Sequence, residues 1–269
     1  MHYMRSLQES FRAESQQGTI HQYQFLGTHT EMVGLIVPGG WEEFFRFIGE
    51  PYDGPMWPME DNRNFFEVLL PKLKAASEQF DMVPCPQHKA VEPQAWDSSD
   101  SRLPGKLEPY FLRNGTGPAY IVGGMVCRPL ITTAESAGKF AIGSIEVSWH
   151  KDLRSGIFDR PSRRLKFEHA HHAFQVVQGS MEFVVGDGPA SRLGAGELLY
   201  VPKGTEFSFT AKSRFAKLYA FANGSGIFEL LQRLGVDHQS PVLPEKASSW
   251  DDNSLKTLED QLSFRLIET

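Results

Sequence analysis

Three histidines within four residues are the strongest chemical feature of this 269-residue sequence. His169, His171 and His172 precede a segment with a strand-like pattern, which ends at a glycine turn at Gly179. Imidazole nitrogens bind first-row transition metals, and two histidines at positions i and i+2 of a strand project from the same face. His169 and His171 are therefore the candidate ligands of one divalent transition metal (Fe, Cu, Ni, Mn or Zn), with His172 or Glu168 as candidate helpers.

A second segment, residues 196–207, reads Gly-Glu-Leu-Leu-Tyr-Val-Pro-Lys-Gly-Thr-Glu-Phe. Together with the histidine segment it resembles the two motifs of the cupin superfamily, H-x-H with a carboxylate and a glycine, and G-[DE]-x4-P-x-G-x2-H. The resemblance implies a barrel with three histidine ligands and one glutamate. Here Phe207 stands in place of the third histidine, and the carboxylate position holds Gln175 or His172, depending on the count. A bound metal and a metal-free pocket therefore both remain open.

The elements that must position these residues are mainly strands. Val, Ile, Tyr, Phe and Trp are abundant in short runs bounded by Gly, Pro, Ser or Asp, which is typical of a jelly roll. The expected strands are Ala119–Met125, Phe140–Trp149, Ala173–Val177, Met181–Val185, Glu197–Val201 and Lys217–Phe221. A helix is expected at Gly226–Leu234. After it, the polar residues 238–269 predict a loosely structured tail.

The N-terminal part of the chain predicts strands followed by helices. Its expected elements are strands at 21–25 and 31–37, an amphipathic helix at 41–48, and a helix to about 79 capped by Asn62 or Asn64. The predicted organisation is a partial N-terminal domain with helices (1–83), a linker (84–108), a complete C-terminal barrel (109–237) and the tail (238–269).

An internal repeat relates the two ends of the chain. A shift of 186 residues aligns residues 18–49 with residues 204–235 without a gap, and both copies consist of strand, turn, strand and helix. The second copy follows a long β region, whereas only seventeen residues precede Gly18 in the first. The repeat therefore predicts a truncated N-terminal cupin. In this alignment His21 falls on Phe207, so it matches the third histidine ligand of a cupin.

The resemblance can be narrowed to one group of cupins. The stretch from Ile20 to Pro55 is similar to the junction between the barrels of fungal quercetin 2,3-dioxygenase-like bicupins, and residues 109–148 are similar to the entry of their second barrel. Related bicupins occur in fungal polyketide gene clusters as cupin-domain oxidoreductases. This resemblance implies a dioxygenase-like oxidoreductase that acts on a small aromatic or polyketide substrate in secondary metabolism.

Composition excludes several other classes of function. The net charge of −6 gives no reason to expect a nucleic acid or an anionic membrane as partner. No run of eighteen apolar residues is present, and the first eighteen residues lack the apolar core of a secretory signal, so we expect no signal sequence. The two cysteines are far apart, and a cytoplasmic location is therefore expected.

Two functions follow from these observations, and they differ in class. The first is a metal-dependent oxidoreductase that uses His169 and His171. The second is a metal-free binding or accessory module, which the missing carboxylate and Phe207 favour. A half-barrel would leave unpaired strand edges, so the truncated domain would have to pack on the second barrel, form a homodimer or aggregate.

Overall fold

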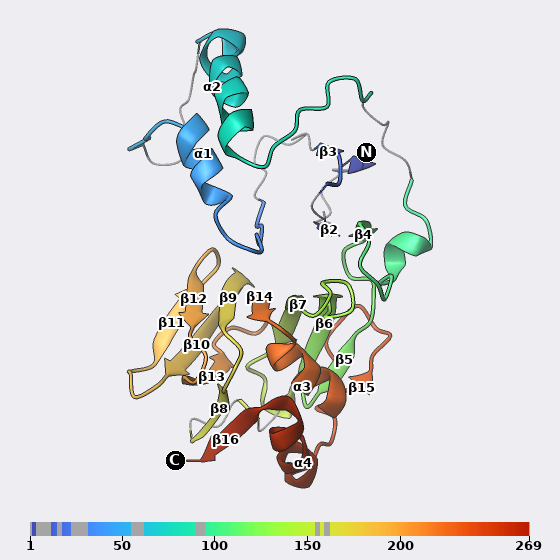
Figure 1. Cartoon of the computed structure of the whole chain (residues 1–269). Helices are drawn as coiled ribbons and strands as arrows, with labels where there is room; N and C mark the ends of the chain where they lie inside the picture. The colour runs from blue at the N-terminus through green and yellow to red at the C-terminus, as the bar shows by residue number, and fades with distance from the viewer. Residues whose placement is uncertain are drawn as a thin grey trace. The chain divides into compact units, whose positions relative to one another are not determined.

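The computed structural model describes residues 2–3, 12–14, 18–22, 32–54, 62–89, 95–153, 157–158 and 162–268. The chain forms two compact units (Figure 1), one of residues 1–4 and 20–93 and the other of residues 5–19 and 94–269. The boundary between residues 93 and 94 lies within residues 84–108, the predicted linker. None of the helices described is long and apolar enough to cross a membrane.

The larger unit contains two antiparallel sheets and is mainly β, which confirms the predicted jelly-roll barrel. In spatial order, the seven-stranded sheet contains β12 (Leu198–Val201), β9 (His172–Gln178), β14 (Ala216–Asn223), β7 (Phe140–Val147), β6 (Met125–Ile131), β5 (Tyr120–Val122) and β15 (Val236–Asp237). The five-stranded sheet contains β11 (Ser191–Gly194), β10 (Ser180–Val185), β13 (Glu206–Ala211), β8 (Arg163–Phe167) and β16 (Phe264–Glu268). A short pair, β2 (Arg12–Glu14) and β4 (Tyr110–Leu112), lies in the same unit. Short 3-10 turns occur at Ser99–Ser101 and Lys151–Leu153.

Alternation along the strands produces the core of the barrel. Successive side chains of a strand point to opposite faces, so every second residue of β9, β14 and β8 is buried. Most of the apolar residues among these, together with those of β10 and β13, belong to one hydrophobic cluster. Its largest fully buried side chains include Phe174, Phe183, Phe207 and Leu218.

The predicted polar tail is instead part of the barrel. Residues 238–269 contain α4 (Asp252–Leu262) and β16, which pairs with β8 along its whole length. Leu255 and Phe264 are fully buried in the core cluster. The prediction of a loose tail was wrong because a few well-spaced apolar residues, set among charged ones, are enough to seat a helix and an edge strand.

Arg163 holds this C-terminal segment to the barrel. Its buried guanidinium lies 2.8 Å from an Asp252 carboxylate oxygen and 2.9 Å from a Glu268 oxygen. The guanidinium also lies over the ring of Trp250, 5.6 Å from its centroid. One side chain on β8 therefore contacts both ends of the segment from Trp250 to Glu268.

The smaller unit contains two helices, α1 (Glu42–Ile48) and α2 (Phe65–Gln79), and a short parallel pair of strands, β1 (His2–Tyr3) and β3 (His21–Gln22). Asn64 caps α2, because its side-chain oxygen accepts a hydrogen bond from the Phe66 amide at 3.0 Å. The two helices thus begin and end close to where the sequence predicts.

The described residues form little of the two strands predicted in this unit. Only residues 21–22 of the segment 21–25 are in a described strand, and residues 23–31 lie outside the described part. Residues 32–37 are irregular and exposed, which corrects the predicted strand there. Their counterparts in the repeat lie within β14, which pairs with β7 and β9 on its two sides. A strand needs such neighbours for its backbone hydrogen bonds, and the described residues of the smaller unit supply none to this segment.

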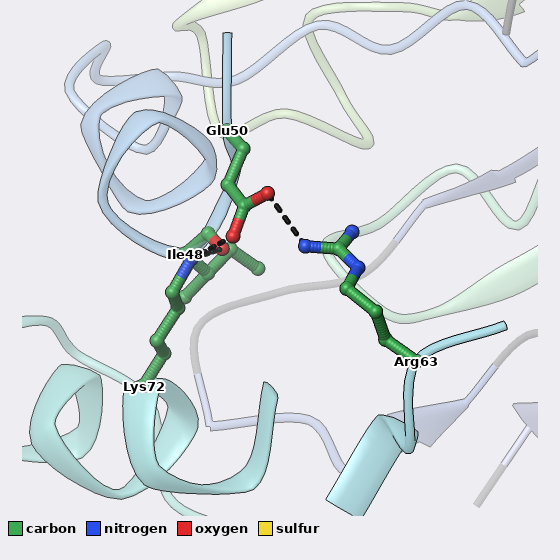
Figure 2. A network of polar contacts seen from close by, with 4 residues as sticks. All are labelled: Ile48, Glu50, Arg63 and Lys72. Atoms are coloured by element: carbon green, nitrogen blue, oxygen red, sulfur yellow. Dashed lines mark hydrogen bonds and ion pairs between the residues drawn. The ribbon is translucent and has the colours of Figure 1, made fainter. Parts of the chain in front are cut away.

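A polar network joins the two helices (Figure 2). The Glu50 carboxylate accepts hydrogen bonds from Arg63 at 2.7 Å and from Lys72 at 3.2 Å. Lys72 also donates to the backbone oxygen of Ile48, the last residue of α1, at 3.2 Å. The hydrogen bond with Arg63 and, to a smaller extent, the one with Lys72 hold the pKa of the Glu50 carboxylate below its usual value. The cation of Lys72 thus stabilises the C-terminal end of α1, where backbone oxygens lack partners.

Candidate functional site

The strand that follows the histidine segment has a different register from the one predicted, and it turns His172 inward instead of His169 and His171. β9 begins at His172, so His169 and His171 precede the strand. The inward, buried positions are His172, Phe174 and Val176, whereas His169 is exposed and His171 is only partly buried. The expectation that His169 and His171 share an inward face is therefore corrected.

His171 instead makes contacts at the edge of the seven-stranded sheet. Its ring stacks on Tyr200 of β12, and its Nδ1 lies 2.6 Å from the Tyr200 hydroxyl. The Lys203 backbone N–H donates to the same nitrogen at 3.4 Å. Because an N–H can only donate, Nδ1 acts as an acceptor in this contact. Tyr200 belongs to the second cupin segment, but no spacing in the sequence marks it as a partner of His171.

His172 is enclosed by aromatic rings and by the start of α3 (Gly226–Leu234). Its ring centroid lies 4.7 Å from that of Phe167 and 5.5 Å from that of Phe207. Its Nε2 accepts a hydrogen bond from the Ile227 backbone N–H at 3.1 Å. Burial, and to a smaller extent the charge of neighbouring His171, lower the pKa of His172 to about 3. The imidazole is therefore neutral at physiological pH.

Phenylalanine rings fill the space between the two sheets around His172. Phe207 lies 5.3 Å from Phe174, centroid to centroid, and Phe174 lies 5.5 Å from Phe183 and 5.9 Å from Phe209. Phe209 in turn stacks on Phe158 at 4.5 Å. All five side chains are at most 2% exposed. The interior of the barrel is thus a packed aromatic core.

The other predicted helpers also face elsewhere. Glu168 is partly exposed and pairs with Lys166, with 3.3 Å between the charged groups. Gln175 alternates to the opposite face of β9 from Phe174, and its buried side-chain oxygen makes no hydrogen bond in the described structure. His21 lies in β3 of the smaller unit, at an exposed position.

These side chains do not form a metal site inside the barrel of the larger unit. An inner-wall site needs several imidazole or carboxylate groups with free lone pairs, whereas this wall offers aromatic carbon and one imidazole whose Nε2 is already bonded. Within the described ranges, no three His, Cys, Asp or Glu side chains are grouped so that they could hold a metal ion. The assignment of His169, His171 and His172 as ligands stays a prediction without geometric support in the described residues.

Comparisons with known proteins show what the chain is similar to. Residues 160–219 match the family model for the EutQ-like cupin domain. The chain is 26% identical over 243 residues to a quercetin 2,3-dioxygenase of Aspergillus japonicus, a match that covers 83% of this chain and 67% of that protein. It is also 40% identical over 57 residues to a quercetin 2,3-dioxygenase of Bacillus subtilis, which is 21% of this chain and 17% of that protein. Among solved structures, the Clostridium difficile EutQ protein aligns at 18% identity with a TM-score of 0.29, over 38% of this chain and 64% of that one.

The barrel and its two motif segments therefore define a cupin protein. Within that superfamily, the chain is similar in sequence to the quercetin 2,3-dioxygenases, as the sequence resemblance implies. The matched region covers about two thirds of the length of the Aspergillus relative and less than a fifth of the length of the Bacillus relative.

Proposed function

We propose that this protein is a dioxygenase-like cupin oxidoreductase for a small aromatic or polyketide substrate, and that its C-terminal barrel is the metal-free half of the catalytic unit. The homology to quercetin 2,3-dioxygenases supports the first part. The observation that carries the second part is the interior of the barrel, where Phe174 and Phe207 occupy space that a metal site would need.

In this proposal the barrel provides a rigid scaffold. A close-packed aromatic core has low compressibility and holds the sheets in one arrangement. Binding of a substrate, or of a neighbouring domain, would then take place on outer surfaces and loops rather than in the interior. A divalent metal, if the protein uses one, would be bound by residues outside the core of this barrel.

The second candidate is an oxidoreductase whose reaction centre includes His169 and His171. One observation favours it. The His171 ring is held by Tyr200 at the rim of the barrel, where it remains partly accessible to small molecules. A fixed imidazole beside a phenol hydroxyl can accept or donate a proton, which is a common catalytic role of histidine.

Oxygen uptake separates the two candidates. The full chain and a His169→Ala/His171→Ala variant would be supplied in turn with Fe, Mn, Ni, Cu and Zn, and oxygen consumption would be recorded with flavonol and other phenolic substrates. We expect the variant to retain the wild-type rate with every metal. A rate at least tenfold lower in the variant would overturn the metal-free assignment and favour the second candidate. If the wild type consumes no oxygen with any metal, the oxidoreductase part of the proposal is contradicted and the accessory role remains.

A further inference from the structure

Helix α3 begins without a cap of its own. Ser225 stands at the N-cap position, but its backbone is already helical (φ −81°, ψ −36°) and its side chain makes no capping hydrogen bond. The first backbone N–H groups of a helix have no partner within the helix, and a buried donor without a partner is costly. Because Gly226 and Ile227 are buried, water cannot easily replace the missing cap.

His172 supplies the acceptor that Ser225 does not. It lies 55 positions earlier in the chain, on β9, and its Nε2 is 3.1 Å from the Ile227 backbone nitrogen. In a neutral imidazole only one ring nitrogen has a free lone pair, so the proton of His172 resides on Nδ1. The lone pair that accepts from Ile227 is the one a metal ion would otherwise take. Capping of α3 and metal ligation through Nε2 therefore exclude each other.

Gly226 makes this close approach possible. Its φ of +49° lies in the left-handed region, where side chains other than glycine are strained. A Cβ at this position would lie 2.6 Å from His172 Nε2 and 2.5 Å from the Ala222 Cβ. The residue that opens the helix thus leaves room for the imidazole ring.

The capped helix packs its apolar side against the seven-stranded sheet. Ile227, Leu230 and Leu231 are fully buried and belong to the same hydrophobic cluster as Phe174 and Phe207. Figure 1 shows α3 beside α4, which also contacts it. The first turn of α3 therefore fixes how this apolar face enters the core.

We propose that His172 is a long-range N-cap of α3, which holds the first turn of this helix against the core, and that it is not a metal ligand. The cupin-like histidine segment thus keeps one imidazole in the interior for a structural purpose. His172 would cap α3 in this way whatever substrate the protein acts on.

Hydrogen–deuterium exchange at the Ile227 amide, read by NMR on the full chain, tests this proposal. The main variant is His172→Phe, which keeps a ring among Phe167, Phe174 and Phe207 but cannot accept a hydrogen bond. We expect roughly two- to thirty-fold faster exchange at Ile227, as for the loss of other N-caps. His172→Gln offers a side-chain oxygen and should come closer to the wild type, whereas the exposed control His169→Ala should not change the exchange.

Exchange at Ile227 that is equally slow in the wild type and in folded His172→Phe would overturn the proposal. Should that variant not fold, zinc or nickel added to the wild type decides the question. Unchanged exchange at Ile227 supports the proposal that His172 Nε2 remains bonded to the helix when the metal is present. Faster exchange on addition of metal means that the metal takes His172 from Ile227, which overturns the assignment.

Discussion

Replacing Phe207 by alanine tests whether the barrel interior is a packed core. Phe207 is fully buried, and its ring contacts those of Phe167, His172 and Phe174 at centroid distances of 5.3 to 6.2 Å. Truncation of a buried phenylalanine removes its apolar contacts and leaves a cavity, which costs about 3–5 kcal/mol of unfolding free energy. Since whole domains are stable by only about 5–15 kcal/mol, this loss is a large fraction of the total.

Urea unfolding followed by circular dichroism measures this loss, and thermal unfolding gives an independent value. For a domain of this size, 3–5 kcal/mol corresponds to a decrease in Tm of roughly 6 to 20 °C. Leu198→Ala is a matched control, because Leu198 lies on β12 of the same barrel but is 58% exposed. We expect this control to lose less than about 1 kcal/mol.

Equal unfolding free energies for Phe207→Ala and Leu198→Ala would contradict a packed interior. A small loss at a fully buried ring would mean that the interior is loosely filled, as expected of a ligand pocket. In that case, binding of small aromatic molecules by the variant and by the wild type would have to be compared.

Three further results are expected. Between pH 6.5 and 5 the unfolding free energy should fall by about 1.6 kcal/mol, because the pKa of His172 is about 3 in the fold and near 6.5 in the unfolded chain, which therefore binds the proton first. Urea midpoints measured across this pH range check this prediction, and His172→Gln should remove the pH dependence. Arg163→Ala should lower the unfolding free energy by about 1–3 kcal/mol, since the guanidinium is buried although its carboxylate partners are exposed. Proteases should then remove the segment from Trp250 onward, and limited proteolysis with mass spectrometry detects this cleavage. Phe207→His restores the histidine of the second motif, and elemental analysis should find no more metal in this variant than in the wild type. Urea unfolding should show a loss of about 1–3 kcal/mol, because the variant buries an imidazole among aromatic rings without a hydrogen-bond partner.

Local patterns in the sequence were enough to predict most of the barrel. Strand segments such as Phe140–Val147 and Ala216–Asn223 have the expected composition and turn boundaries, and α3 occupies the predicted residues 226–234. The strand predicted at 31–37 has the same composition, but its described residues 32–37 form no strand, since pairing depends on neighbouring strands rather than on the segment alone. The C-terminal segment was missed because its anchor, Arg163, lies far away in the sequence.

The site was harder to predict because the histidine segment supports two strand registers. His169 and His171 fit one alternation, and His172 and Phe174 fit the other, so a difference of one residue exchanges the inward and outward faces. One signal was available in the sequence. Phe207, where a histidine would be expected, indicates an apolar interior, and this agrees with the register that places Phe174 inside. The bond from Ile227 to His172 spans 55 residues and no local pattern reveals it.

Metal content tests the central claim, a metal-free C-terminal barrel, most directly. The purified chain and its His169→Ala/His171→Ala and His172→Gln variants would be loaded with Fe, Mn, Ni, Cu or Zn, desalted and analysed by elemental mass spectrometry. We expect the metal content of both variants to equal that of the wild type. Near-stoichiometric metal in the wild type that is lost in either variant would contradict the account and establish the histidine segment as a metal site.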